Sequence, residues 1–130
     1  MQESRKILLD TNFLLIPEQL KIDIFEELQR ICYFPFQVYI LDKTLEELQS
    51  IKQRTQGKDK TAANVALELI KVKNIQTIDT SSYSEDNYVD SIIQQLKDDY
   101  IVATQDIALR KHFKRYIILR QKKYLELKER

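Results

Sequence analysis

Five short apolar runs alternate with helical patterns along this chain, and that alternation constrains the fold more than any other feature. The runs are rich in β-branched and aromatic residues and cover positions 6–10, 38–41, 76–79, 100–104 and 116–120. Continuous apolar runs of this length are typical of strands buried on both faces. Strands that alternate with helices predict an α/β fold, with a mostly parallel sheet of about five strands in a three-layer α/β/α sandwich.

The segments between the runs carry apolar residues at helical spacing. Stripes over 20–31, 45–51, 62–70 and 89–96 repeat every three or four residues, and a short helix is expected from about Ile107 to Phe113. The polar stretch 53–60 around Gly57 is expected to be the longest ordered loop between two helices. The 130 residues suit one domain over 1–130, with no internal repeat.

Several classes of protein are disfavoured by composition. Gly57 is the only glycine, so glycine-rich phosphate-binding loops are absent. Cys32 is the only cysteine, which excludes a disulfide framework and a thiolate metal site and leaves core packing as its expected role. Neither a membrane span nor a signal peptide is indicated, and a cytoplasmic protein is expected.

Two aspartates stand where the carboxyl ends of parallel strands should gather ligands. Asp10 closes the first run, and Asp106 follows the fourth. An ionised carboxylate at the end of an apolar run is costly to bury without a partner, so Asp10 needs either a cation or a place at the rim. The two carboxylates can meet if the first and fourth strands are neighbours, which predicts the strand order 3-2-1-4-5. Asp79 also ends a run, but on an expected edge strand.

Two helix starts supply further acids. Glu47 flanks the buried stripe of its helix, whereas Glu46 lies almost opposite, so Glu47 is the better inward candidate. Asp90 flanks the stripe of the helix over 89–96, while Asp86 is interpreted as a first-turn acid favoured by the helix dipole.

Asp10, Glu47, Asp90 and Asp106 are therefore four carboxylates that one topology can bring together. Clustered carboxylates are ligands for a hard cation such as Mg²⁺ or Mn²⁺, and two such ions would promote phosphodiester hydrolysis. His112 lies among basic residues and is expected at the surface or in contact with a phosphate. Each acid alone is more often a cap or surface group. A phosphoacceptor receiver domain also places aspartates at strand ends, but the lysine that it needs has no match here.

The order of these motifs resembles that of the PIN-domain nucleases. LLDTN at 8–12, TLEEL at 44–48, VDSII at 89–93 and ATQD at 103–106 are similar to the successive motifs of that family. The resemblance implies metal-ligating and catalytic roles for the four acids. It also implies that Asn12 supports the site and that Thr104 orients a carboxylate or a water there.

The chain departs from the pattern at two positions. Ser91 stands where many members carry a second acid, and Ala108 stands where some members carry another. Fewer acidic ligands could weaken the binding of a second metal. The ending YIILRQKKYLEL at 116–127 is similar to an archaeal branch related to the small-subunit processome nucleases of ribosome assembly.

The resemblance implies a Mg²⁺- or Mn²⁺-dependent endoribonuclease acting on RNA, with precursor rRNA as the expected substrate. Residues 106–130 carry 9 Lys and Arg against 3 Asp and Glu, whereas 1–105 carry 12 against 17. A basic tail suits a polyanion, although a solvated or partner-binding face is an equal alternative. The expected phosphate contacts are Arg54, Lys58, Lys60, Arg110, Lys111, Lys114 and Arg115.

Two other functions stay open from the sequence. The first is a toxin of a toxin–antitoxin pair, which is also a ribonuclease. The second is a catalytically silent RNA-binding assembly module. A homodimer, an antitoxin and a ribosome-assembly protein are the partners left open.

Overall fold

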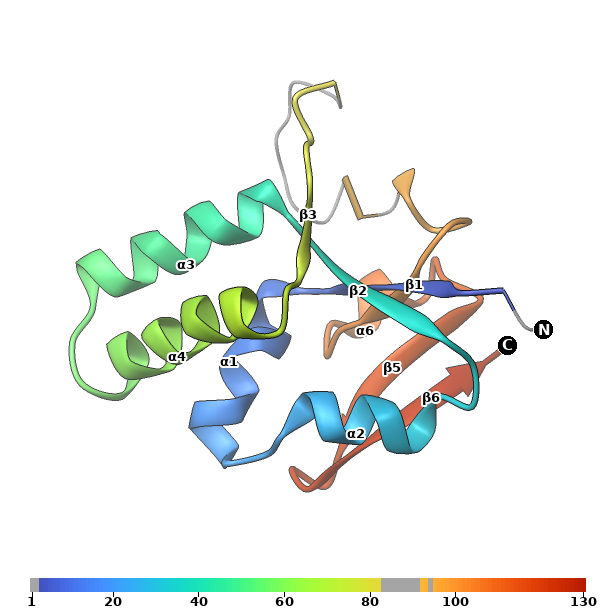
Figure 1. Ribbon diagram of the computed structural model, residues 1–130, viewed down its shortest axis with the longest axis horizontal. Coiled ribbons are helices and arrows are strands. Elements are labelled where there is room, and N and C mark those ends of the chain that lie inside the picture. The colour runs from blue at the N-terminus through green and yellow to red at the C-terminus, as the bar shows by residue number, and fades with distance from the viewer. Residues whose placement is uncertain (1–2, 83–91, 94) are drawn as a thin grey trace.

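A computed structural model describes residues 3–82, 92–93 and 95–130 of the chain. These residues form a six-stranded sheet in the order β3-β2-β1-β4-β5-β6, with β5 and β6 antiparallel and the other neighbours parallel (Figure 1). The α/β class and the order of the first five strands are confirmed, and a sixth strand extends the sheet. The strands are β1 (Arg5–Leu9), β2 (Phe36–Leu41), β3 (Gln76–Ile78), β4 (Ile101–Ala103), β5 (Arg115–Arg120) and β6 (Tyr124–Glu129).

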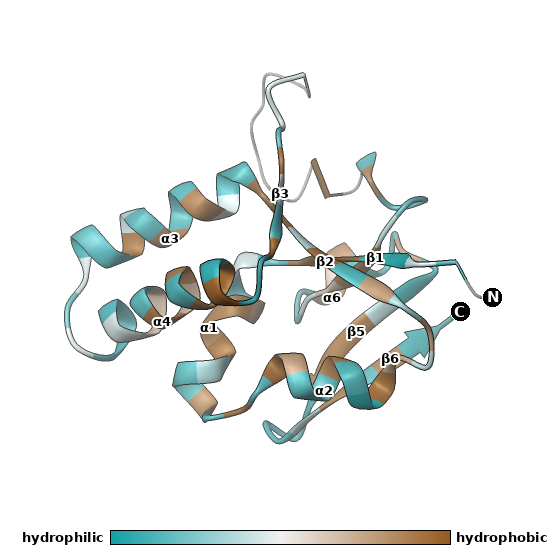
Figure 2. Cartoon of the chain, viewed as in Figure 1, coloured by the Kyte–Doolittle hydropathy of each residue, from teal (hydrophilic) through white to brown (hydrophobic). Residues whose placement is uncertain are grey.

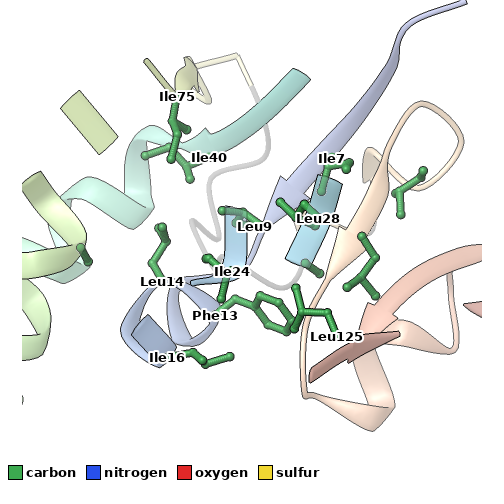
Figure 3. Packing of buried hydrophobic residues seen from close by; sticks show 14 of the residues in the cluster. Ile7, Leu9, Phe13, Leu14, Ile16, Ile24, Leu28, Ile40, Ile75 and Leu125 are labelled. Atoms are coloured by element: carbon green, nitrogen blue, oxygen red, sulfur yellow. The ribbon is translucent and has the colours of Figure 1, made fainter. Parts of the chain in front are cut away.

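Helices lie on both faces of this sheet because its central strands are apolar on both sides. Along β1, Ile7 and Leu9 join a core with helices α1 and α2, while Leu8 faces a second core that includes Ile92 and Phe113 (Figure 3 shows the first). Figure 2 shows brown apolar segments within β1, β2 and β5, and teal segments that alternate with brown ones along α3 and α4. The helices are α1 (Thr11–Leu20), α2 (Ile24–Ile31), α3 (Asp42–Arg54), α4 (Lys58–Val72) and α6 (Ile107–Arg110).

Two expectations about the helices were wrong. The stripe over 20–31 belongs to two helices, because Lys21 has a left-handed backbone with φ 56° and Asp23 caps a new helix at Ile24. The expected loop over 53–60 is only residues 55–57, since Gly57, with φ 68°, starts α4 directly after α3.

Among the described helices none is long and apolar enough to cross a membrane.

Cys32 follows α2 and is buried in the first core, as expected. Burial raises the pKa of its thiol to about 11. A thiol with so high a pKa stays protonated and unreactive near neutral pH, so its role is packing.

Two side chains of α2 cover part of the free edge of β6. The Glu27 carboxylate accepts a hydrogen bond from the backbone N–H of Leu125 at 2.8 Å, and Arg30 donates to the Leu125 carbonyl at 2.9 Å. Arg30 also donates to both oxygens of Glu27, each at 2.9 Å. These groups replace the bonds that a neighbouring strand would make, which protects the edge from pairing with another chain.

We expect Glu27→Gln to destabilise the fold by roughly 1–2 kcal/mol at pH 7, because glutamine removes the negative charge and replaces one of the two acceptor oxygens with a donor. The hydrogen bond from Arg30 holds the pKa of Glu27 below its ordinary value, against the opposing effect of burial. A carboxyl whose pKa is lower in the folded state than in the unfolded state stabilises the fold. This contribution is fully present above the unfolded pKa of about 4.3, and it is lost as the pH falls through the folded pKa.

Urea unfolding of both proteins from pH 7 to pH 3 measures this contribution. The difference between them should be largest at neutral pH and shrink at the acidic end. Glu26→Gln, a change at an exposed neighbour in the same helix turn, is the control and should change stability much less. A difference that does not vary with pH would contradict the role of the Glu27 charge.

Candidate functional site

Asp10 lies at the carboxyl end of β1, where it caps helix α1. Its side chain is 7% exposed, and one carboxylate oxygen, Oδ1, accepts from the Thr11 backbone N–H at 2.8 Å. The other, Oδ2, accepts from the Thr104 hydroxyl at 2.8 Å. The apolar run before Asp10 is thus followed by a carboxylate held in one orientation by neutral donors.

Thr104 connects Asp10 to Asp106 across two adjacent strands. Its hydroxyl is fully buried, donates to Asp10 and accepts from the backbone N–H of Asp106 at 3.1 Å. Asp106 is exposed, and its Oδ1 caps the short α6 by accepting from the Leu109 N–H at 3.1 Å. The adjacency of β1 and β4 therefore brings both aspartates to the same edge of the sheet.

Helix α3 is attached to this edge through two threonines. The Thr11 hydroxyl donates to the Thr44 hydroxyl at 3.2 Å, and both residues are buried. Glu47 lies three residues after Thr44, which places both on one side of the helix. Glu47 is exposed, as is Glu46, which forms an ion pair with Lys43 at 3.6 Å.

Asp42 binds the segment after β3 to the start of α3. Its Oδ1 accepts from the Thr80 hydroxyl at 2.6 Å, and its Oδ2 accepts from the Thr80 N–H at 3.1 Å. Partial burial raises the pKa of Asp42, but these two bonds and one from the Lys43 N–H outweigh it, so the net pKa is lowered. The negative charge of Asp42 is therefore used in holding two elements together.

Thr11, Thr44, Asp42 and Thr80 are residues near the site that sequence reasoning missed. Their signal was position, because each stands within two residues of the end of a strand or within the first turn of a helix. Asn12, which was expected to support the site, is exposed in the first turn of α1. Asp79 follows the edge strand β3 and accepts from the Ser81 N–H at 2.9 Å.

Asp90, Asp86 and Ser91 lie outside the described residues. Within the ranges that are described, no group of three or more His, Cys, Asp or Glu side chains could hold a metal ion. Mg²⁺ commonly uses only one or two protein carboxylates and keeps several waters. The oxygen donors of Asp10 and Asp106, with no histidine or thiolate beside them, fit the chemistry of such a hard cation.

The expected phosphate contacts lie in three places. Arg54, Lys58 and Lys60 are near the tip of the α3–α4 hairpin, which projects away from the sheet in Figure 1. Arg110 and Lys111 are at the end of α6, and the Arg110 guanidinium lies 5.6 Å from the centre of the Tyr116 ring.

Lys114 and Arg115 occupy the third place, immediately before and at the start of β5. Since β5 is parallel to β4, they lie at the amino edge of the sheet, opposite Asp10. The Arg115 Nε atom lies 3.7 Å from a Glu129 carboxylate oxygen.

Comparisons with known proteins identify the family and the fold of this chain. The family described as "PIN like domain" matches residues 7–122, nearly the whole chain. This chain belongs to the PIN-like domain family. Ribonuclease VapC4 of Methanocaldococcus jannaschii is 35% identical over 131 residues, which cover 94% of this chain and 95% of that protein.

A solved PIN domain has the same fold. The structure of the PIN domain endonuclease Utp24 superposes with a TM-score of 0.72 at 21% sequence identity, covering 96% of this chain and 92% of that one. At this identity the likeness shows the fold alone. The resemblance to PIN domains drawn from the sequence motifs is therefore confirmed.

Proposed function

We propose that this PIN-like domain is a metal-dependent endoribonuclease that hydrolyses RNA phosphodiester bonds at the carboxyl edge of its sheet. The observation that carries the proposal is the pairing of Asp10 and Asp106 through the Thr104 hydroxyl. The full-length relationship to a ribonuclease supports RNA as the substrate.

Asp10 and Asp106 would hold Mg²⁺ or Mn²⁺, with Glu47 and Asp90 as the further carboxylates of the set. When bound, the cation supplies positive charge to the scissile phosphate and lowers the pKa of the attacking water. Thr104 and the Thr11 N–H fix the Asp10 carboxylate, so its geometry is set before substrate arrives. Preorganised charge of this kind lowers the barrier because little rearrangement is needed during reaction.

Purified protein incubated with single-stranded RNA tests this activity. Cleavage should require Mg²⁺ or Mn²⁺ and stop in chelator. Metal-independent cleavage would contradict the proposed chemistry. Absence of cleavage, with RNA binding intact, would instead favour the silent RNA-binding module.

The biological role is better supported as that of a toxin paired with an antitoxin than as rRNA processing. The relative that matches at 35% identity over nearly its full length is Ribonuclease VapC4. The likeness to Utp24, at 21% identity, carries the fold only. Precursor rRNA therefore rests on the sequence motifs alone.

Induced expression in cells separates the two roles. A toxin should arrest growth, and the product of an adjacent small gene should relieve the arrest. Accumulation of uncut precursor rRNA after deletion of the gene, without any growth arrest on induction, would favour rRNA processing.

A further inference from the structure

A groove of about 430 Å³ lies at the amino edge of the sheet, opposite the proposed active site. Its basic residues come from the starts of three adjacent strands. Arg5 and Lys6 begin β1, Lys97 lies in the turn before β4, and Lys114 and Arg115 begin β5. Two carboxylates, Asp98 and Asp99, also line the groove, so five cations leave a net positive lining.

One of these residues, Arg5, packs its guanidinium against the core rather than presenting it to the groove. The Nη1 atom of Arg5 is buried and has no hydrogen-bond partner among the described residues. The Arg5 guanidinium lies 4.5 Å from the centre of the Phe34 ring, which fixes the plane of its donors. The Arg5 guanidinium therefore packs beside Phe34 of the first core, and Arg5 contributes to the groove its position at the start of β1 and its positive charge.

The remaining lining fits a nucleotide chain. Tyr100 is half-buried in the groove, with its ring edge-to-face with Tyr39 at 5.5 Å between centres. The Lys6 ammonium lies 5.4 Å from the centre of the Tyr100 ring. Aromatic rings beside rows of cations bind single-stranded nucleic acid, because bases stack on the rings and phosphates contact the cations. Asp98 and Asp99 can accept hydrogen bonds from ribose 2′-hydroxyl groups, which DNA lacks.

We propose that this amino-edge groove binds single-stranded RNA that flanks the cleaved phosphate. The inference rests on the proposed function for the identity of the RNA as substrate. The five residues of β1 separate the groove from Asp10 by roughly 17 Å, at about 3.3 Å per residue. RNA must therefore extend beyond the cleavage position to reach the groove, and the groove favours longer substrates.

The test compares two charge-matched double variants. Lys97→Ala with Lys114→Ala removes two exposed cations of the groove, and Lys52→Ala with Lys71→Ala removes two exposed cations of α3 and α4. Binding is measured by fluorescence anisotropy in chelator, with RNA of about 4 and about 16 nucleotides, the range of site sizes for single-strand-binding folds.

We expect the groove variant to bind the long RNA more weakly than the wild type, with a smaller loss for the short RNA because it carries fewer phosphates. The slope of log affinity against log salt should become shallower by about 1.4, because each cation that neutralises a phosphate of a single strand accounts for roughly 0.7. The control variant should match the wild type. Equal behaviour of the two variants with long RNA would overturn the proposal.

Two further measurements make the assignment specific. Photocrosslinking of long RNA carrying 4-thiouridine should label peptides that contain Tyr100 or Lys114, and labelling confined to other peptides would overturn the groove. Single-stranded DNA bound as tightly as RNA, with the same loss in the variant, would overturn the choice of RNA. Binding is measured without metal, so it is independent of RNA cleavage. Failure of cleavage would refute the proposed nuclease activity, whereas the binding results alone decide whether the groove binds RNA.

Discussion

Asp10→Asn should reduce RNA cleavage by about 10²–10⁴-fold while leaving the fold nearly as stable as the wild type. Loss of a metal-ligating carboxylate removes several kcal/mol of transition-state stabilisation, and each 1.36 kcal/mol is a factor of ten in rate. Asparagine has the same shape and can still accept from the Thr11 N–H. The Thr104 hydroxyl can accept as well as donate, so it can bond the new amide.

Asp79→Asn is the matched control for this change. Asp79 also follows a strand of the sheet, but β3 is an edge strand and Asp79 is exposed. Single-turnover cleavage rates of the two variants, together with their melting temperatures, make the comparison. Equal activity of Asp10→Asn and the wild type would refute the proposed site. An equal loss in Asp79→Asn would show that the effect is not specific to Asp10.

Thr104→Val should lower both stability and activity. Valine has nearly the same volume, but it cannot donate to Asp10 or accept from the Asp106 N–H. Two buried hydrogen bonds are lost, one of them to a carboxylate, which should cost roughly 2–4 kcal/mol in unfolding free energy. Substitution of a residue that orients a metal ligand commonly lowers metal affinity or activity by about 10–100-fold.

Thr104→Ser keeps the hydroxyl and separates positioning from packing. The serine variant should recover most of the activity, although it loses a buried methyl group. The Mg²⁺ concentration for half-maximal cleavage should rise in the valine variant and return toward the wild-type value in the serine variant. If the metal requirement is the same in all three proteins, Thr104 has a structural role only.

The strand order was predictable because two acids had to meet. Asp10 and Asp106 each follow an apolar run, and the rule that ligands gather at carboxyl ends required their strands to be neighbours. Helix α1 was missed because its start, Thr11, directly follows the strand, and Asp10 was interpreted as a ligand rather than also as a helix cap. The structure shows Asp10 as the N-cap of α1, and the proposed ligand role uses the same carboxylate.

Strand β6 was not predicted from the sequence. Glu126 and Lys128 alternate with Leu125 and Leu127, which is typical of a strand, but the run is short and highly charged. Its stability comes from β5 on one side and the Glu27–Arg30 pair of α2 on the other. The α2 residues are about a hundred positions away in sequence, so only the tertiary structure reveals them.

The places of the basic residues in the fold could be predicted from the sequence only in part. Lys114 and Arg115 precede a parallel strand, so their place at the amino edge follows from strand direction and could have been inferred. The same argument places Arg5 and Lys6 at the start of β1, whereas Lys97, in the turn before β4, could not be placed in the groove from the sequence. Proximity in space makes them one surface.

The central claim is that carboxylates at the carboxyl edge of the sheet hold a divalent cation. A crystal structure of the wild-type protein grown with Mn²⁺, with the metal located by anomalous scattering, tests it most directly. The account predicts an anomalous peak beside the Asp10 carboxylate that is absent from Asp10→Asn crystals grown in the same way. A peak that persists in that variant, or Mn²⁺ bound only elsewhere on the wild-type protein, would contradict it.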